Sequence, residues 1–416
     1  MATYADNSIL KTSGYVAKEA ALGLYNKSLL LAAVDRQYAA EFGITAGGAK
    51  VGSSITIRKP AIFLTTNNVD LTVSAFTEQS IVVKLATRTG VHFDLDTQQV
   101  TLDIESEGKG YSERTLQPAG EAIGSAVESN GFKLIANTAS NFSVVESAGY
   151  DVTKLKAVIA KMNASLTKQL APRNDRWAFF SSDFEADFVA GNYTLFHSNE
   201  ELEKGYKDAT VSRFAGLDIG STDLVYSRLN GAGGDAGFTV SAYTEGSNSI
   251  TVTHATLIAD VVVGDKLTIT GCNLVNAQTK KAYVGVGVQR TVQAITAVDA
   301  THIALTIEPI WFTATDSRQN ASATPVGKAL VWLGTKGKNY VCIPVLQKSS
   351  VTFASADLYL PRNVEMAARE KAMDISLRFI RDYRIGTDDL PNRLEILGDF
   401  FAVRPEWMGI VEVGLD

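Results

Sequence analysis

The spacing of hydrophobic positions changes several times along this chain, and each change predicts a different kind of element. Over residues 12–42, apolar side chains recur at the spacing of one helical face, and Gly43 follows as a stop signal. Over residues 116–138 the same spacing returns, with Pro118 in the first turn, where a missing N–H costs nothing. We therefore expect a terminal amphipathic helix that ends near Phe42 and a long second helix that serves as the spine of a domain.

Between these helices the pattern alternates with the period of a β-strand. Residues 55–58, 69–73 and 81–85 alternate apolar and polar positions, and a polar, turn-like run occupies residues 65–68. This pattern predicts a long β-hairpin with little apolar surface near its tip. Such a hairpin is only marginally stable alone and generally needs a partner.

Residues 148–225 mix the two periods. A helical face runs from Leu155 to Met162, a short apolar strand is expected at residues 177–180, and helical spacing returns at residues 184–189. This region reads as an α/β or α+β core without catalytic residues.

A different texture begins at Leu229. Residues 229–328 contain 34 Thr, Val or Ile, whereas residues 111–140 contain 5. Because β-branched residues at that density favour strands, we expect a small antiparallel barrel or sandwich inserted into another domain. The expected strands are residues 238–242, 249–254, 266–270, 282–288 and 302–307.

After this segment the mixed pattern returns. Residues 375–383 alternate as a long strand, and two further strands are expected over residues 394–403 and 410–413, turned at Arg404-Pro405. The fold class predicted for the whole chain is therefore α+β.

Composition narrows the range of functions. The chain has 416 residues, and its 39 basic and 45 acidic side chains give a net charge of −6. That sign excludes a basic nucleic-acid grip over the whole surface. The length predicts two or three domains, or one domain with a large insertion. No secretion signal or membrane span is visible, so we expect a protein made and used in a cytoplasm or released without a signal.

Residues with reactive side chains are few and scattered. Cys272 and Cys342 are far apart and are predicted to be free, buried thiols. His92, Asp94 and Asp96 alternate on one strand and could hold a metal, but a solvated strand edge is the favoured interpretation. Phosphate-loop, dinucleotide and Gly-x-Ser-x-Gly motifs are absent. We therefore predict no cofactor, no metal and no catalytic residue, and an enzyme is disfavoured.

Four stretches carry a resemblance to a known family. Together they cover most of the chain in a specific order: residues 34–38 (VDRQY) with 51–60 (VGSSITIRKP), residues 111–119 (YSERTLQPA), residues 261–271 (VVVGDKLTITG), and residues 400–406 (FFAVRPE). This ordered set, with the expected sequence of elements, resembles the P22 coat protein family of tailed-phage major capsid proteins. The resemblance implies the capsid fold of phage Hong Kong 97 with an inserted β-barrel.

The resemblance also implies a role for each segment. By this resemblance the segments are the N-terminal arm (1–48), the extended hairpin loop (49–90), the peripheral domain with the spine helix (91–147), the axial domain (148–228 and 329–351), the inserted β-barrel (229–328) and the closing strands (352–416). About ten residues precede the expected arm helix, so scaffolding would come from a separate protein. The turn at residues 245–248 is shorter than the capsomer-bridging loop of the type coat protein.

From the arm, the hairpin and the closing strands we select candidate contacts between subunits: Leu24, Tyr25, Leu31, Arg58, Lys59, Phe63, Asn67, Asn68, Phe76, Glu78, Arg378 and Arg384. The expected partners are further copies of the chain in hexameric and pentameric capsomers, a scaffolding protein, a portal protein, enclosed double-stranded DNA in weak contact, and in some particles a decoration protein. Assembly would take place in the cytoplasm of a host bacterium. The alternatives are an encapsulin-like bacterial compartment and a phage tail or baseplate protein.

Overall fold

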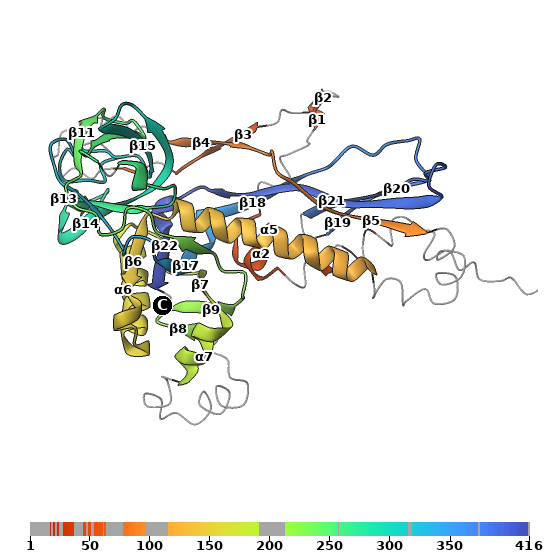
Figure 1. The fold of residues 1–416 in the computed structure, drawn as a ribbon, viewed down its shortest axis with the longest axis horizontal. Coiled ribbons are helices and arrows are strands. Elements are labelled where there is room, and N and C mark those ends of the chain that lie inside the picture. Colours follow the sequence, from red (N-terminus) through yellow and green to blue (C-terminus); the bar gives the residue numbers. More distant parts are fainter. Residues whose placement is uncertain are drawn as a thin grey trace, which may run out of the picture. The chain divides into compact units, whose positions relative to one another are not determined.

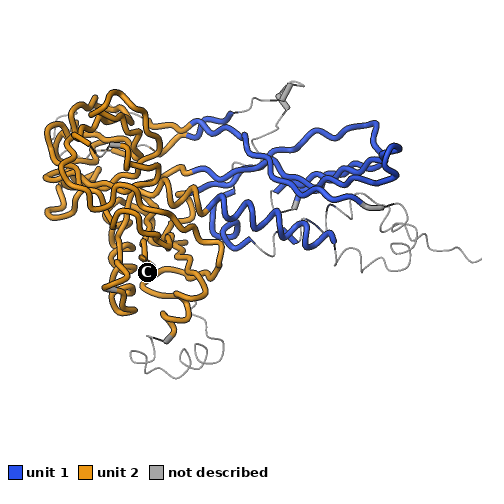
Figure 2. Tube along the Cα trace, in the orientation of Figure 1, with its two compact units in different colours: residues 1–57, 82–131, 351–401 blue, residues 58–81, 132–350, 402–416 orange. Residues whose placement is uncertain are grey.

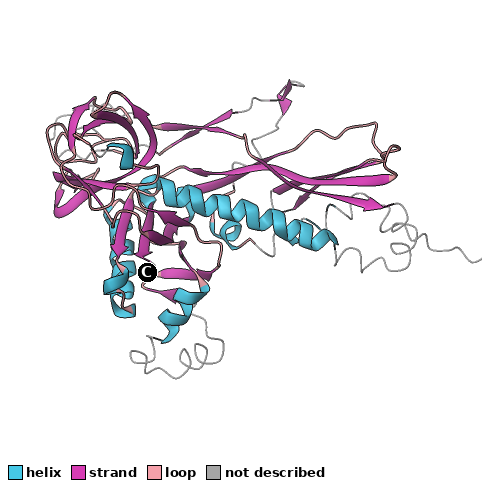
Figure 3. Ribbon diagram, in the orientation of Figure 1, coloured by secondary structure: helices cyan, strands magenta, loops and turns pink. Residues whose placement is uncertain are grey.

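The computed structural model describes most of the chain after residue 114 and scattered segments before it. The described residues are 17, 20, 23–24, 28–36, 45–46, 49–50, 54–60, 62–63, 78–96, 115–190, 213–256, 258–314, 318–372 and 375–414. The chain forms two compact units, each of them assembled from separate segments (Figure 2). Among the described residues, more lie in strands than in helices (Figure 3).

The first unit comprises residues 1–57, 82–131 and 351–401. Its main sheet has five strands, in which β18, β21, β20 and β19 lie in that order and β5 pairs with β21 (Figure 1). Their bounds are Arg88–Asp96 (β5), Val351–Ala356 (β18), Met366–Ala372 (β19), Ile375–Arg381 (β20) and Asp389–Ala402 (β21).

The spine helix α5, Gln117–Thr138, begins in the first unit and ends in the second. It confirms the helix expected over residues 116–138. In the first unit α5 approaches the N-terminal helical residues closely, and glycines make this possible. A Cβ atom added at Gly120 would lie 2.1 Å from the Ala20 carbonyl oxygen, so only glycine fits there.

The expectation of one helix over residues 12–42 was wrong. Ser28 has an extended backbone, and a separate short helix, α2 (Leu29–Ala33), follows it. The chain then leaves the helix because the Asp35 N–H donates to the Val351 carbonyl at 3.1 Å and the Asp35 carbonyl accepts from Phe353 at 2.9 Å. Pairing of Asp35 with the distant strand β18 therefore overrides the local helical pattern. Further on, Thr45–Ala46 (β1) and Ala49–Lys50 (β2) form a two-stranded ladder.

The expected hairpin is present at its base. Ser54–Arg58 (β3) pairs with Ser80–Lys84 (β4) in a separate two-stranded sheet. The strand expected over residues 69–73 lies outside the described residues.

The second unit comprises residues 58–81, 132–350 and 402–416 and contains two sheets. The larger sheet is mixed and has the order β6-β22-β17-β7-β9-β8, with β10 also paired to β17. Its strands are Asn141–Val145 (β6), Arg176–Phe180 (β7), Arg213–Phe214 (β8), Leu217–Ser221 (β9), Ser227–Leu229 (β10), Asn339–Gln347 (β17) and Met408–Gly414 (β22). Helix α6, Val152–Lys168, packs its apolar face on this sheet, and α7, Ser182–Ala190, follows β7.

The other sheet is antiparallel, in the order β11-β12-β15-β14-β13-β16. Its strands are Thr239–Tyr243 (β11), Ser249–Thr253 (β12), Lys266–Val275 (β13), Ala282–Ala297 (β14), His302–Glu308 (β15) and Leu330–Trp332 (β16). The two outer strands meet, because the Val240 N–H donates to the Lys328 carbonyl and the Leu330 N–H donates to the Phe238 carbonyl. The sheet thus closes on itself around a core that includes Trp311, Phe238 and Leu305.

Candidate functional site

The hairpin base carries two charged pairs, one exposed and one mostly buried. Arg58 and Glu78 lie 3.4 Å apart, and both side chains are largely exposed. The Lys59 N–H donates to the Gln79 carbonyl at 2.7 Å, and its ammonium lies 3.8 Å from the Glu406 carboxylate. Phe63, beyond this base, is 65% exposed. The hairpin therefore presents both charge and an aromatic ring at its surface.

Several other candidate contact residues lie inside their own subunit. Leu24, Leu31 and Arg378 are each at least nine-tenths buried, which leaves them little surface to offer a neighbour. Arg384 is exposed and lies 3.6 Å from Asp389. Tyr25, Asn67, Asn68 and Phe76 lie outside the described residues. An intersubunit role for all these candidates stays a prediction.

Glu395, on β21 in the first unit, collects three arginines. Arg88 donates to its two carboxylate oxygens at 2.5 and 2.6 Å, Arg393 Nε lies at 2.9 Å, and Arg378 also donates to it. Burial alone would raise the pKa of Glu395, but the hydrogen bonds from Arg88 and Arg378 outweigh it and hold the pKa at about 2. We call Glu395 and its three arginines the Glu395 network.

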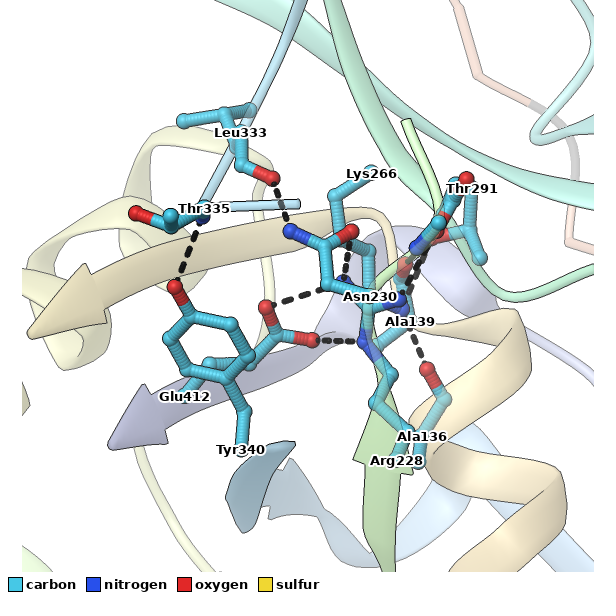
Figure 4. Close-up of polar contacts among 12 residues, drawn as sticks. Ala136, Ala139, Arg228, Asn230, Lys266, Thr291, Leu333, Thr335, Tyr340 and Glu412 are labelled. Carbon is cyan, nitrogen blue, oxygen red and sulfur yellow. Dashed lines mark hydrogen bonds and ion pairs between the residues drawn. The ribbon is translucent and has the colours of Figure 1, made fainter. Parts of the chain in front are cut away.

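A second network joins the two sheets of the second unit (Figure 4). Arg228, on β10, donates to the Glu412 carboxylate on β22 at 2.5 and 3.1 Å, and to Asp265 at 3.1 Å. Asp265 immediately precedes β13 and also accepts the backbone N–H groups of Gly231, Ala232 and Val262. Each of these charged side chains is at most 4% exposed. We call Arg228, Asp265, Lys266 and Glu412 the junction network.

Lys266 completes this network from β13. Its ammonium donates to the Ala136 carbonyl at the end of α5 and to Thr291 Oγ1 at 3.2 Å (Figure 4). Thr291 in turn donates to the Ala139 carbonyl at 2.6 Å. Burial lowers the pKa of Lys266 to about 8, although Glu412 and Asp265 oppose the shift. The junction network therefore ties the closed sheet to the mixed sheet and to the last turn of α5.

The hydrophobic spacing did not predict the junction network, although Asp265 and Lys266 lie in the stretch 261–271 that resembles the coat protein family. A usable signal was present, however, in Glu412, which is an acidic residue inside the apolar run Ile410–Val413. A fully buried carboxylate needs partners, so an acidic residue at such a position predicts a basic side chain from a distant part of the chain. Its partner Arg228 is 184 positions away, and no local spacing can indicate it.

The chemistry of these networks is structural. Cys272 and Cys342 are free and buried, as expected. Burial raises the pKa of Cys342 to about 12, so the thiol stays protonated and unreactive. Across the part of the chain that the structure describes, no three His, Cys, Asp or Glu side chains converge as a metal site would require. No described helix is both long and apolar enough to span a membrane.

Comparison with known proteins identifies this architecture. The sequence model of the family described as "P22 coat protein - gene protein 5" matches residues 1–414. The protein is thus a phage coat protein, whose copies assemble into the multimeric shell of the virion. The chain belongs to the P22 coat protein family, and it is the major capsid protein of a tailed bacteriophage. The resemblance drawn from the sequence is therefore confirmed, together with the α+β capsid fold that it implied.

Solved structures of similar chains are phage and particle proteins with little sequence identity. The chain from Mycobacterium phage Che8 has a TM-score of 0.49 at 8% identity, covering 92% of this chain and 90% of that one. The capsid of cyanophage P-SCSP1u has a TM-score of 0.46 at 10% identity, covering 88% and 85%. A virus-like particle from Pyrococcus furiosus has a TM-score of 0.38 at 9% identity, covering 95% and 97%. No curated protein sequence matches the chain.

Proposed function

We propose that copies of this subunit form hexameric and pentameric capsomers, and that the hairpin over residues 49–90 clamps each subunit to its neighbour. The hairpin base is the observation that carries this proposal. In each of β3 and β4 a single side chain, Ile57 or Val83, is fully buried, and the other positions are exposed or intermediate. A two-stranded ribbon with so small a core is marginal alone and gains stability from a partner surface.

The remaining segments are proposed to divide the other tasks. Residues 1–48 are an arm, residues 91–147 and 352–416 build the peripheral domain, residues 148–228 and 329–351 build the axial domain, and residues 229–328 are an insertion domain. The junction network supports a firmly held insertion, because buried charge pairs break only at a cost of several kcal/mol. A rigid subunit loses less conformational entropy when it assembles.

The partners follow from this role. We propose a separate scaffolding protein during assembly, a portal protein at one vertex, and enclosed double-stranded DNA, with a decoration protein as a further partner in some particles. The subunit itself has no catalytic task. Its net charge of −6 supports a wall that holds DNA without broad electrostatic adhesion.

Electron microscopy of the full-length chain co-expressed with its scaffolding protein tests the capsomer proposal. We expect closed shells from the wild type. Phe63→Ser should leave the subunit folded and reduce the yield of shells roughly tenfold, because exposed aromatic residues dominate interface energies. Val298→Ser is the matched control, since Val298 is similarly exposed at 58% but directly follows β14, outside the hairpin segment 49–90.

Two results would overturn the clamp. One is a Phe63→Ser variant that assembles as well as the wild type, and the other is an equal loss for Val298→Ser. Wild-type subunits that remain monomeric with scaffolding present would overturn the capsomers as well.

A further inference from the structure

Helix α6 carries charge of one sign only. Its 17 residues include four lysines, at positions 154, 156, 161 and 168, and no acidic residue. Arg173 and Arg176 follow shortly after the helix, with Asp175 between them. This local excess of positive charge contrasts with the net charge of −6 of the whole chain.

Beside α6 lies a cavity of about 340 Å³. One wall is a single face of the helix, formed by Ala160, Asn163, Ala164 and Thr167 at helical spacing. The turn at Ala215-Gly216 also lines the cavity, and Asn163 Nδ2 donates a 2.7 Å hydrogen bond to the Ala215 carbonyl. Three guanidinium groups complete the lining, those of Arg173, Arg176 and Arg213.

Arg176 is a buried cation held only by neutral acceptors. Its side chain donates to the carbonyls of Pro172 and Ala171 at 2.7 Å each, to Thr167 Oγ1 at 3.0 Å, and to Asn163. Among the described residues no carboxylate pairs with it. Burial lowers its pKa, and the positive charge of Arg173 lowers it further. A buried charge without a counterion is costly, so this guanidinium creates a site that favours an anion.

The other two arginines of the lining are exposed. Arg173 is exposed and has no ion pair with a described residue. Arg213 is 69% exposed, and its Nε lies 3.6 Å from Asp218, too far for a hydrogen bond of normal geometry. Among the described residues, the three arginines thus share a single, loosely placed carboxylate partner, the Asp218 beside Arg213, and positive charge remains in excess at the cavity.

We propose that this cavity binds a phosphate oxyanion, held by the guanidinium groups of Arg173 and Arg213 above the buried charge of Arg176. The planar donor fork of arginine matches the oxygens of phosphate, and a doubly charged phosphate balances the excess better than a single carboxylate. The phosphate is either free in solution or part of the backbone of enclosed nucleic acid. One such site per subunit contacts few phosphates, so the adhesion to DNA would be weak and strongly salt-dependent.

Calorimetric titration of the full-length, unassembled subunit with inorganic phosphate at low ionic strength tests this site, with chloride at equal ionic strength as the reference. We expect the wild type to bind phosphate and to gain thermal stability from it. Arg173→Gln and Arg213→Gln should each weaken binding about tenfold, since each removes one charge-assisted contact. Arg362→Gln, an exposed arginine of the first unit, is the matched control and should bind like the wild type.

A fluorescent DNA duplex separates the two sources of phosphate. Duplex binding that free phosphate displaces, and that both variants weaken, assigns the site to the nucleic-acid backbone. Phosphate binding without duplex binding assigns it to free phosphate. No phosphate binding by the wild type, unchanged affinity in both variants, or preference for a glutamate-rich peptide over phosphate would overturn the proposal. The site lies within one subunit, so its test is independent of assembly. Wild-type protein that forms shells but binds no phosphate would overturn this inference and leave the capsomer proposal standing.

Discussion

The Glu395 network of the first unit and the junction network of the second unit use the same residue types in different surroundings. In the Glu395 network one buried carboxylate is shared by three arginines, two of which are nearly half exposed. In the junction network two carboxylates face an arginine and a lysine, and all four side chains are almost completely buried. One network is unbalanced and open to water, whereas the other is balanced and dry.

The difference shows where charge can be left in excess. Water screens the two exposed arginines around Glu395, so their surplus charge costs little. The side chains of the junction network are almost completely buried, so each charge needs a partner, and the pairing fixes how the closed sheet attaches to the mixed sheet. We therefore expect substitutions in the junction network to cost more than equivalent ones elsewhere.

The largest effect is expected for Glu412→Gln. It removes the negative charge nearest Arg228 and leaves Asp265 as the remaining carboxylate partner of that buried guanidinium, at a cost of about 3 kcal/mol in the free energy of unfolding. Urea denaturation of the unassembled subunit measures this loss. The exposed residue Glu365, changed to Gln, is the matched control and should shift stability little. If Glu412→Gln and Glu365→Gln lower the stability equally, burial of the charge pair does not decide the cost and the prediction fails.

Glu395→Gln is expected to rank second, at about 2 kcal/mol, because three charge-assisted hydrogen bonds weaken but two of the arginines remain solvated. This carboxylate has a folded pKa of about 2 against an ordinary value of 4.5. Its contribution is therefore complete above pH 4.5 and is lost as the pH falls toward about 2. The gap in stability between wild type and variant should close over that window, and a gap independent of pH would contradict it.

Lys266→Met tests the junction network at high pH, through the buried cation instead of a carboxylate. Because burial lowers the folded pKa of Lys266 from 10.5 to about 8, the folded state loses this proton first as the pH rises. Wild-type stability should thus rise between about pH 8 and pH 10.5 relative to the Met variant, which lacks the titrating group. Thermal midpoints of both proteins across this window measure the difference. If the thermal midpoints of the two proteins change in parallel with pH, the pKa of Lys266 is not lowered by folding, which contradicts the prediction.

The smallest effect is expected for Arg58→Gln at the hairpin base. Its 3.4 Å pair with Glu78 is exposed on both sides, so its loss should change the unfolding free energy by about 0.5 kcal/mol or less. Urea denaturation of the unassembled subunit checks this value. If the residue matters for assembly, shell yield will fall while subunit stability stays constant. A stability loss as large as that of Glu395→Gln would place this pair among the buried networks.

Prediction from sequence succeeded where local periodicity decides the structure. The spine helix α5 and the strands β7, β11, β12 and β15 lie within about one residue of their predicted bounds. Strands β13 and β14 begin where predicted but extend further, to Val275 and Ala297. Prediction failed at residues 34–36, where a helix was expected but the backbone of Asp35 pairs with the strand at Val351 and Phe353. Periodicity reports which face of a segment is buried, and it carries no information on which distant segment covers that face.

The candidate contacts show the same limit. Arg378 was selected as a possible contact between subunits, but its side chain is buried and donates to Glu395 on the neighbouring strand. The arginines of the α6 cavity were not selected, because Arg176 and Arg213 are 37 positions apart and are brought to one cavity by the pairing of both β7 and β8 with β9.

The sequence by itself determined the elements, the β-rich character of residues 229–328, the scarcity of reactive side chains and, through ordered motifs, the coat protein family. Each of these properties is local or additive along the chain. Only the tertiary structure decided that Glu412 meets Arg228, that the N-terminal helix ends before Asp35, and that three arginines share one cavity. These outcomes depend on contacts across tens to hundreds of residues, where the free energy comes from burial and pairing and not from the preference of any one segment.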